Sequence, residues 1–478
     1  MAERKDILMG RLRSGEPLGR GEQFRLTFLL AWPSILAQLA MCLMSYIDAA
    51  MVGRLGSAQA AAIGLVSSTT WIFASFCYSN SSGFSVQVAH RCGAKDFAGA
   101  RRIFRHGIFV AVGLSLLLAA LAVSIHGALP RWLGGTPEIL ADASVYFLIY
   151  ALFLPVMQLA IFCEASLIAS GNAKVSGITS IAMCVLDVVF NYLFIFVLGL
   201  GVKGAALGTG LATLCAGGFL LWYATCRCPE LRQAGSWVRP ARRILGGIRT
   251  QKAGALDAEQ KDIFKRAFGI SWPLWLQNLV TRGAYIAATV LVAPLGTVAI
   301  AANSFGIIAE GFCYLPGYGM QDAATTLVGQ SLGAKRPDMA RRFAWLTIGS
   351  GAAMMTFLAV LMWAFAPQIM GLLSPDAEVI TLGAKCLRIQ AWAELLFGVS
   401  IVAYGCCVGA GDTLVPSAIN LLSMWVIRLG IALLLIPRFG LEGYWIAMAT
   451  ELCVKGLVFA VRIGRGRWMK TLLTVPGT

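Results

Sequence analysis

The sequence contains little charge for its length. Charged residues make up 13% of its 478 residues, about half of the roughly 25% that is typical of soluble globular domains. Hydrophobic residues make up 58% of the chain, and the mean hydropathy is +0.74. The alternating ten-residue segments of a transmembrane β-barrel are absent. These proportions exclude an ordinary soluble domain and predict an all-α polytopic membrane protein.

The sequence also lacks the motifs of common catalytic and nucleotide-binding sites. It contains no P-loop, no GxSxG and no HExxH, and its three histidines, His90, His106 and His126, are scattered. The 13 cysteines include no CxxC pair and lie mostly in apolar stretches, which is typical of free buried thiols. We therefore expect no enzyme activity, no ATP use and no cofactor.

Twelve apolar stretches are long enough to cross a membrane as helices. Six precede residue 227 and six follow residue 265. They lie at about 26–52, 60–89, 106–128, 141–169, 177–199, 204–226, 266–293, 299–330, 343–366, 379–409, 417–436 and 441–461.

The net charge of +16 follows from the placement of lysine and arginine. If both termini face the cytoplasm, 30 of the 39 basic residues lie on the inner side and four in outer loops. This is the asymmetry of the positive-inside rule, so it indicates topology and not a nucleic-acid partner. The first 25 residues are polar and Arg-rich, without the apolar core of a cleavable signal. We expect a multi-pass protein of the cytoplasmic (inner) membrane with both termini cytoplasmic.

The two halves of the chain match at an offset of 240 residues. Trp32–Pro33 corresponds to Trp272–Pro273, and the loop Gly93–Lys95 corresponds to Gly333–Lys335. Gly171 corresponds to Gly411 at the same offset, and, with a one-residue slip, Gly201 corresponds to Gly440 and Gly204 to Gly443. An ordered series at one offset indicates a duplication.

The duplication predicts two six-helix lobes. Because six is even, both lobes have the same orientation and are related by a pseudo-two-fold axis along the membrane normal. A central cleft is expected where they meet, and a monomer is sufficient. The predicted parts are a cytoplasmic tail (1–25), an N-terminal lobe (26–226), a basic cytoplasmic linker (227–265), a C-terminal lobe (266–463) and a second tail (464–478).

The first apolar stretch contains one proline and one acid. Pro33 and Asp48 are fifteen positions apart, or roughly 22 Å along a helix. Proline removes a backbone hydrogen bond and kinks a helix, so Pro33 and its counterpart Pro273 are candidate hinges. A carboxylate within a membrane is costly unless it faces protein, water or a cation. The alternatives are an ordinary kink at Pro33 and a solvated Asp48 at the outer interface.

Further polar groups occur in the fifth and sixth stretches. Asp187 and Asn191 are four apart and share a helix face, while Thr209 lies on a helix whose glycines favour close packing. With Asp48 they offer the hard oxygen ligands that suit Na⁺, or two carboxylates that share a proton. The alternatives are a structural hydrogen-bond pair at Asp187–Asn191 and a Thr209 hydroxyl bonded to its own helix.

The repeat is asymmetric at these acids. Asp48 corresponds to Ala288, Asp187 to Ile427 and Asn191 to Ile431. We therefore expect a cation or proton site in the N-terminal lobe only. Candidates for substrate contacts in the cleft are five other polar residues of the apolar stretches: Gln38, Gln277, Asn278, Glu310 and Glu394.

Residues 22–465 resemble the MATE (multidrug and toxic compound extrusion) family. The likeness rests on WPSILAQLAMCLMSYIDAAMVGRLG, on the paired loops RCGAKDFAGARR and SLGAKRPDMARR, and on LDVVFNYLFIF and GVKGAALGT. The resemblance implies export of organic, often cationic, compounds in exchange for Na⁺ or H⁺ by alternating access. It also implies that Asp48 is the central coupling residue and that the first helix bends at Pro33.

The chain differs from the sequence pattern of the family in two places. Some members have Asn and then Asp in the fifth helix, whereas here Asp187 precedes Asn191. The NorM-like branch has an acid in the seventh helix, where this chain has Thr281, and an Asp about one turn from Glu394. The absence of the seventh-helix acid favours the DinF-like branch, with coupling in the N-terminal lobe.

The sequence therefore predicts a secondary antiporter that exports amphipathic or cationic small molecules, with H⁺ or Na⁺ as coupling ion. Asp48, Asp187, Asn191 and Thr209 would be the metal ligands if that ion is Na⁺. The expected partners are a small organic substrate and membrane lipid. A flippase for lipid-linked oligosaccharides is the alternative, but its pyrophosphate needs several cations, and only Arg282 and Arg428 lie in mid-helix.

Overall fold

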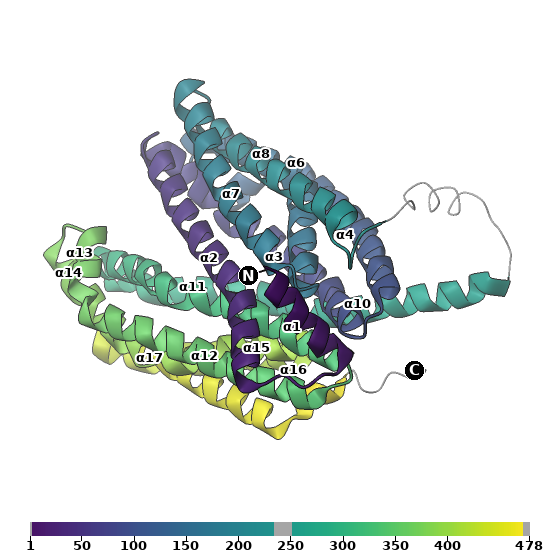
Figure 1. The fold of residues 1–478 in the computed structure, drawn as a ribbon. Coiled ribbons are helices and arrows are strands. Elements are labelled where there is room, and N and C mark those ends of the chain that lie inside the picture. Colours follow the sequence, from purple (N-terminus) through teal and green to yellow (C-terminus); the bar gives the residue numbers. More distant parts are fainter. Residues whose placement is uncertain (1, 234–250, 472–478) are drawn as a thin grey trace. The chain divides into compact units, whose positions relative to one another are not determined.

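The computed structural model describes residues 2–233 and 251–471, in which every regular element is a helix (Figure 1). A short helix, α1 (Ala2–Ser14), precedes the long apolar helices. In the first part of the chain the long helices are α2 (Arg20–Gly53), α3 (Ser57–Gly93), α4 (Phe97–Ile125), α6 (Pro137–Ala169), α7 (Ala173–Tyr192) and α8 (Gly201–Trp222). The short helix α5 (Leu129–Trp132) lies between α4 and α6 in the sequence. One-turn π-helices, η1 (Leu193–Val197) and η2 (Tyr223–Arg227), extend α7 and α8.

The second part of the chain continues with further long helices joined by shorter ones. They are α10 (Gln251–Val292), η3 (Ala293–Leu295), α11 (Thr297–Gly333), α12 (Pro337–Ala364), α13 (Ala366–Leu373), α14 (Ala377–Ala391) and α15 (Glu394–Gly409). The last elements are α16 (Leu414–Leu422), the π-helix η4 (Ser423–Arg428), α17 (Leu429–Arg465) and η5 (Arg467–Thr471). Helix α10 begins inside the predicted linker.

The helices account for twelve membrane crossings. Ten helices of the described chain are long and apolar enough to cross a membrane, and α14 with α15, bent by 58°, makes an eleventh span. One of the ten, Leu414–Arg465, has 52 residues and would be about 78 Å long, far more than the roughly 30 Å of a bilayer core. Gly440 interrupts it with φ 55° and ψ −133°. Divided there, it gives two crossings, and the total is the twelve expected.

The backbone repeats at the predicted offset. Among the described residues, Lys95 and Lys335 are the two non-glycine residues with positive φ, at 58° and 57°. Both end a helix in the same way, because the next amide donates to the carbonyl five residues earlier: Asp96 to Arg91 (2.9 Å) and Arg336 to Ser331 (2.9 Å). Side chains rarely adopt this conformation. Its recurrence at positions 240 apart confirms the internal duplication.

The chain forms two compact units whose boundaries lie inside helices. Unit 1 contains Met1–Cys42 and Leu276–Thr478, and unit 2 contains Leu43–Trp275. The boundary between Cys42 and Leu43 divides α2, and the boundary between Trp275 and Leu276 divides α10. The predicted lobes, 26–226 and 266–463, divide neither of these helices between the two lobes. These lobe bounds stay a prediction.

Close backbone contacts explain why these two helices are divided. In unit 1, a methyl group on Gly319 of α11 would lie 2.5 Å from the amide nitrogen of Ile35 on α2. In unit 2, a methyl group on Gly83 of α3 would lie 2.6 Å from the carbonyl oxygen of Ala267 on α10. Helices approach this closely only where one of them has no side chain. The first half of each divided helix therefore packs against a helix from the other half of the sequence.

We expect Gly319→Ala to destabilise unit 1. The added methyl group would meet the backbone of Ile35, which cannot rotate away, so α2 and α11 would have to separate. Overpacking of this kind costs about 1–3 kcal/mol and should lower the thermal unfolding midpoint of the purified protein. Gly349→Ala on α12 is the control, because nothing lies within 4 Å of its added methyl group. Equal midpoints for the two variants would contradict the tight contact.

Candidate cation-binding site

Asp48, Asp187 and Asn191 come together inside unit 2. Asp48 lies on the second half of α2, and the other two side chains lie one turn apart on α7. The side-chain amide of Asn191 donates to Asp48 Oδ1 (2.9 Å) and to Asp187 Oδ2 (3.0 Å). The two carboxyl groups also lie within hydrogen-bonding reach of one another. Residues separated by 143 positions in the sequence thus form one cluster, which we call the Asp48 cluster.

Glycines of α8 allow α7 to carry this cluster. A methyl group on Gly208 would lie 2.1 Å from Asn191 Oδ1 and 2.9 Å from its backbone nitrogen. One on Gly204 would lie 2.7 Å from the backbone of Phe194. The sequence predicts that this glycine-rich face of α8 packs closely against another helix. The structure shows that its neighbour is the end of α7 that carries Asn191. The glycines therefore fix the depth at which the Asn191 amide lies.

The Asp48 cluster contains more acceptors than donors. Asp187 and Asn191 are buried, at 1% and 2% exposure, and Asp187 Oδ1 and Asn191 Oδ1 accept no hydrogen bond from any described residue. No described lysine or arginine pairs with Asp48 or Asp187. Buried acceptors are nearly always satisfied in native proteins. A proton on one carboxyl group or a cation between the oxygens would satisfy them, and the donor set of carboxylates and an amide oxygen fits Na⁺.

Two further side chains border the Asp48 cluster. The hydroxyl of Thr209, an exposed residue of α8, lies beside the Asp187 carboxyl group. Tyr146 of α6 interacts electrostatically with both acids. Sequence reasoning named Thr209 but missed Tyr146, because a tyrosine in an apolar helix carries no signal of its neighbours.

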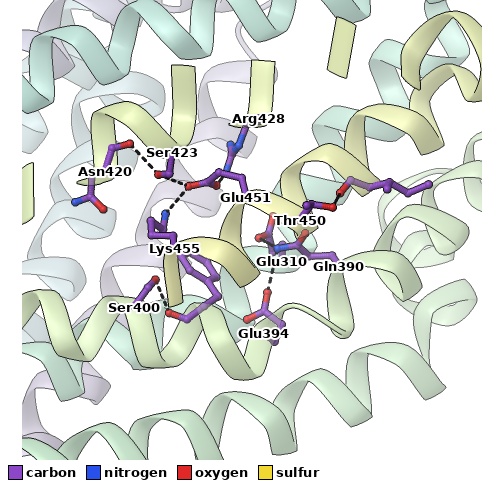
Figure 2. Close-up of polar contacts among 12 residues, drawn as sticks. Glu310, Gln390, Glu394, Ser400, Asn420, Ser423, Arg428, Thr450, Glu451 and Lys455 are labelled. Carbon is purple, nitrogen blue, oxygen red and sulfur yellow. Dashed lines mark hydrogen bonds and ion pairs between the residues drawn. The ribbon is translucent and has the colours of Figure 1, made fainter. Parts of the chain in front are cut away.

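The five candidates for substrate contacts all belong to unit 1. Gln38, Gln277 and Asn278 are half-buried in unit 1, where Gln277 Oε1 accepts from the Tyr404 hydroxyl (3.2 Å). Glu310 and Glu394 are buried and are joined through Gln390 (Figure 2). The candidate hinges are Pro33, half-buried in unit 1, and Pro273, buried in unit 2, and both lie within continuous helices.

The fold and this cluster can be compared with known proteins. A model of the MatE family matches residues 33–193 and again residues 273–434. The chain belongs to the MatE family. Its two matches begin 240 residues apart, in agreement with the duplication. Members of the family are transporters and not enzymes.

Several relatives match along almost their whole length. The probable multidrug resistance protein NorM of Chromobacterium violaceum is 27% identical over 445 residues, which cover 91% of this chain and 92% of that protein. A protein of the same name from Pseudomonas aeruginosa is 29% identical over 442 residues, covering 88% and 85%. Membership of the DinF-like branch stays a prediction.

Solved structures share the fold. A point mutant of the Vibrio cholerae MATE transporter VcmN superposes with a TM-score of 0.85 at 19% identity, covering 93% of this chain and 97% of that one. A multidrug resistance MATE family transporter in an outward-facing conformation gives a TM-score of 0.84 at 19% identity, with the same coverage. The predicted twelve-helix membrane fold is confirmed.

We expect Gly208→Ala to abolish transport while the protein still folds. The added methyl group would overlap Asn191 and push its amide away from the two carboxyl groups. Transport by the purified protein in vesicles checks this, together with its thermal midpoint. Gly218→Ala on the same helix is the control, since its methyl group would meet nothing within 4 Å. Wild-type transport by Gly208→Ala would show that the position of Asn191 is unimportant.

Proposed function

We propose that this MatE-family protein is a secondary active antiporter that exports amphipathic or cationic organic compounds in exchange for H⁺ or Na⁺. The observation that carries the proposal is the Asp48 cluster. Two carboxyl groups and an amide converge in a transporter, without a basic partner among the described residues, and this arrangement suits a reversible monovalent cation. The names of the NorM relatives support a drug-like substrate.

The coupling ion would act through its charge. Without an ion, Asp48 and Asp187 repel each other, because two carboxylates in a low-dielectric site cannot both stay ionised at close range. A bound proton or Na⁺ removes this repulsion and lets the second half of α2 stay close to α7. Release of the ion reverses the change. In this way, binding of the ion at Asp48 moves the second half of α2.

Pro33 would be the point where that movement bends the helix. It lies in the half of α2 that belongs to unit 1, whereas Asp48 lies in the half that belongs to unit 2. A proline inside a helix lacks the backbone hydrogen bond that resists bending. We further propose that the protein acts as a monomer in the cytoplasmic membrane, with both termini in the cytoplasm, as the distribution of basic residues predicts.

Efflux of a fluorescent organic cation from vesicles tests the proposal. An imposed pH gradient and an imposed Na⁺ gradient are applied separately to the wild type, to Asp48→Asn and to Asp187→Asn. We expect one gradient to drive efflux, and both variants to fall to the level of protein-free vesicles. Asp376→Asn, in the exposed N-cap of α14, is the control and should transport normally. Transport driven by neither gradient would refute antiport and favour the lipid-linked oligosaccharide flippase.

We expect Pro33→Ala to slow transport and to keep its ion dependence. The alanine restores a backbone hydrogen bond, so bending of α2 becomes more costly while the Asp48 cluster is unchanged. The initial rate of efflux at saturating substrate is the measurement. Pro367→Ala, in the first turn of α13, is the control, because proline removes no helical hydrogen bond there. Equal slowing of both variants would remove the hinge from the mechanism.

A further inference from the structure

The same tight turn occurs once in each half of the chain. It joins α3 to α4 at Lys95 in unit 2, and α11 to α12 at Lys335 in unit 1. Both lysines are exposed, and both have positive φ, at 58° and 57°. All other described residues with positive φ are glycines. The two turns therefore place a lysine where this chain otherwise uses a residue without a side chain.

This placement costs free energy. A side chain in the left-handed conformation crowds the backbone, whereas glycine adopts that conformation freely. The positive-inside rule accounts for basic residues at this end of the helices, but it does not require a strained one. A helix C-terminus attracts a cation, yet a lysine at a neighbouring position would gain as much without strain. The two lysine side chains therefore have a role that neither the backbone nor the topology explains.

Neither lysine forms an ion pair with an acid of the described chain. In the turn of unit 2, the carboxylate of Asp96 accepts from Arg91 (2.7 Å) and from the backbone amide of Gly99 (2.8 Å). In the turn of unit 1, Asp338 lies 3.7 Å from Arg336. The acids nearest in sequence thus face arginines, and the two ammonium groups remain exposed.

Both turns lie in strongly basic segments. Residues 91–105 contain five basic side chains and one acid, and residues 331–342 contain four basic side chains and one acid. The excess of positive charge is thus similar in the two units. An exposed basic cluster at a membrane surface attracts the headgroups of anionic lipids.

One arginine of each segment ties the turn to the end of another helix. Arg101 donates to the carbonyl oxygen of Pro229 (2.7 Å), just after η2, and Arg341 donates to that of Gly464 (3.2 Å), at the end of α17. These two bonds bring the start of α4 next to the end of η2, and the start of α12 next to the end of α17. Each turn therefore belongs to a fixed corner of its unit.

Each corner also contains a half-exposed tryptophan. A methyl group on Gly464 would lie 3.9 Å from the ring of Trp345, and the guanidinium of Arg227 lies 5.7 Å from the ring centroid of Trp222. Exposed tryptophans of membrane proteins lie at the level of the lipid headgroups. We call these groups the Lys95 corner (Lys95, Arg101, Trp222, Arg227, Pro229) and the Lys335 corner (Lys335, Arg341, Trp345, Gly464).

We propose that the Lys95 corner and the Lys335 corner each bind the headgroup of an anionic phospholipid, with its phosphate on the lysine ammonium group. An ammonium group presents three donors, and a phosphodiester presents charged oxygens that accept them. The tryptophans favour a lipid over a dissolved anion, because they place the corners at the depth of the headgroups. The inference does not rest on the proposed transport function.

Thermal unfolding of the purified protein in vesicles tests the two corners. Vesicles of phosphatidylcholine are compared with vesicles of equal parts phosphatidylcholine and phosphatidylglycerol, which is anionic. We expect phosphatidylglycerol to raise the unfolding midpoint of the wild type, and to raise that of the double variant Lys95→Gly with Lys335→Gly by less than half as much. Lys95→Arg with Lys335→Arg keeps both charges and should keep the rise.

Lys203→Gln is the matched control. It removes the same charge from an exposed position in the first turn of α8. The segment Gly201–Arg227 has 27 residues, so this position lies about 40 Å from the Lys95 corner, at the other end of the helix. Lys203→Gln should show the wild-type rise. A rise as small as that of the double variant would mean that any lost lysine has this effect, and would overturn the site.

The backbone gives a test of opposite sign. In phosphatidylcholine alone, the double glycine variant should unfold at the wild-type midpoint or above it, because glycine relieves the left-handed strain. A lower midpoint there would show that the lysines stabilise the fold through contacts within the protein, and would overturn the site. An equal rise of wild type and double variant with phosphatidylglycerol would do the same. An equal rise of the wild type with dissolved inorganic phosphate would replace the lipid with a soluble anion.

Discussion

A carboxylate inside a membrane protein needs a proton, a cation or a hydrogen-bond donor, because lipid offers no water to replace them. The buried acids of this protein meet that requirement in different ways. Glu451 has Arg428, Lys455 and Ser423 around it and is fully compensated. Asp187 and Glu394 each keep one oxygen without a donor among the described residues. Compensated acids hold helices together, whereas uncompensated ones are suited to bind and release an ion.

The two halves of the chain share a backbone fold, but their buried acids stand at different positions in it. The loop conformation at Lys95 recurs at Lys335, so both halves keep the backbone of one ancestral unit. In the first half the acids without a basic partner, Asp48 and Asp187, lie on α2 and α7. In the second half the acids joined by Gln390 lie on α11 and α15. The helix contact made by Glu310 and Gln390 is made by Thr70 and Tyr150 in the other half. The shared fold therefore accepts buried acids at different positions in its two halves.

In the mechanism we propose, the divided helices connect ion binding to movement. Each of α2 and α10 is a single helix with an internal proline, and its two halves pack in different units. Glycines at the contacts with α11 and α3 hold the first halves close to their neighbours. In that mechanism, a change at Asp48 bends α2 at Pro33, because a helix resists bending except where its hydrogen bonds are interrupted.

Much of the structure of this protein could be predicted from the hydropathy and periodicity of its sequence. The apolar stretches predicted the twelve crossings, the offset of 240 predicted the repeat, and the spacing of Asp187 and Asn191 placed them on one helix face. These features are local or recur along the chain, so a sequence displays them directly. Asp48 was named as a candidate from the sequence, although it lies 143 positions before Asn191. Only tertiary packing brings its Oδ1 atom to 2.9 Å from the side-chain nitrogen of Asn191.

Other features were decided by tertiary structure alone. The comparison of equivalent positions led us to expect a cation site in the N-terminal lobe only, because Ala288, Ile427 and Ile431 replace the polar residues there. That expectation stays a prediction, and the comparison does not reveal that Gln390 joins Glu310 and Glu394 inside unit 1. The division of α2 and α10 between the units was likewise invisible, because a helix pattern does not show which neighbour each half will touch. Helix packing depends on contacts between distant segments, and these contacts decide which buried acids find a partner.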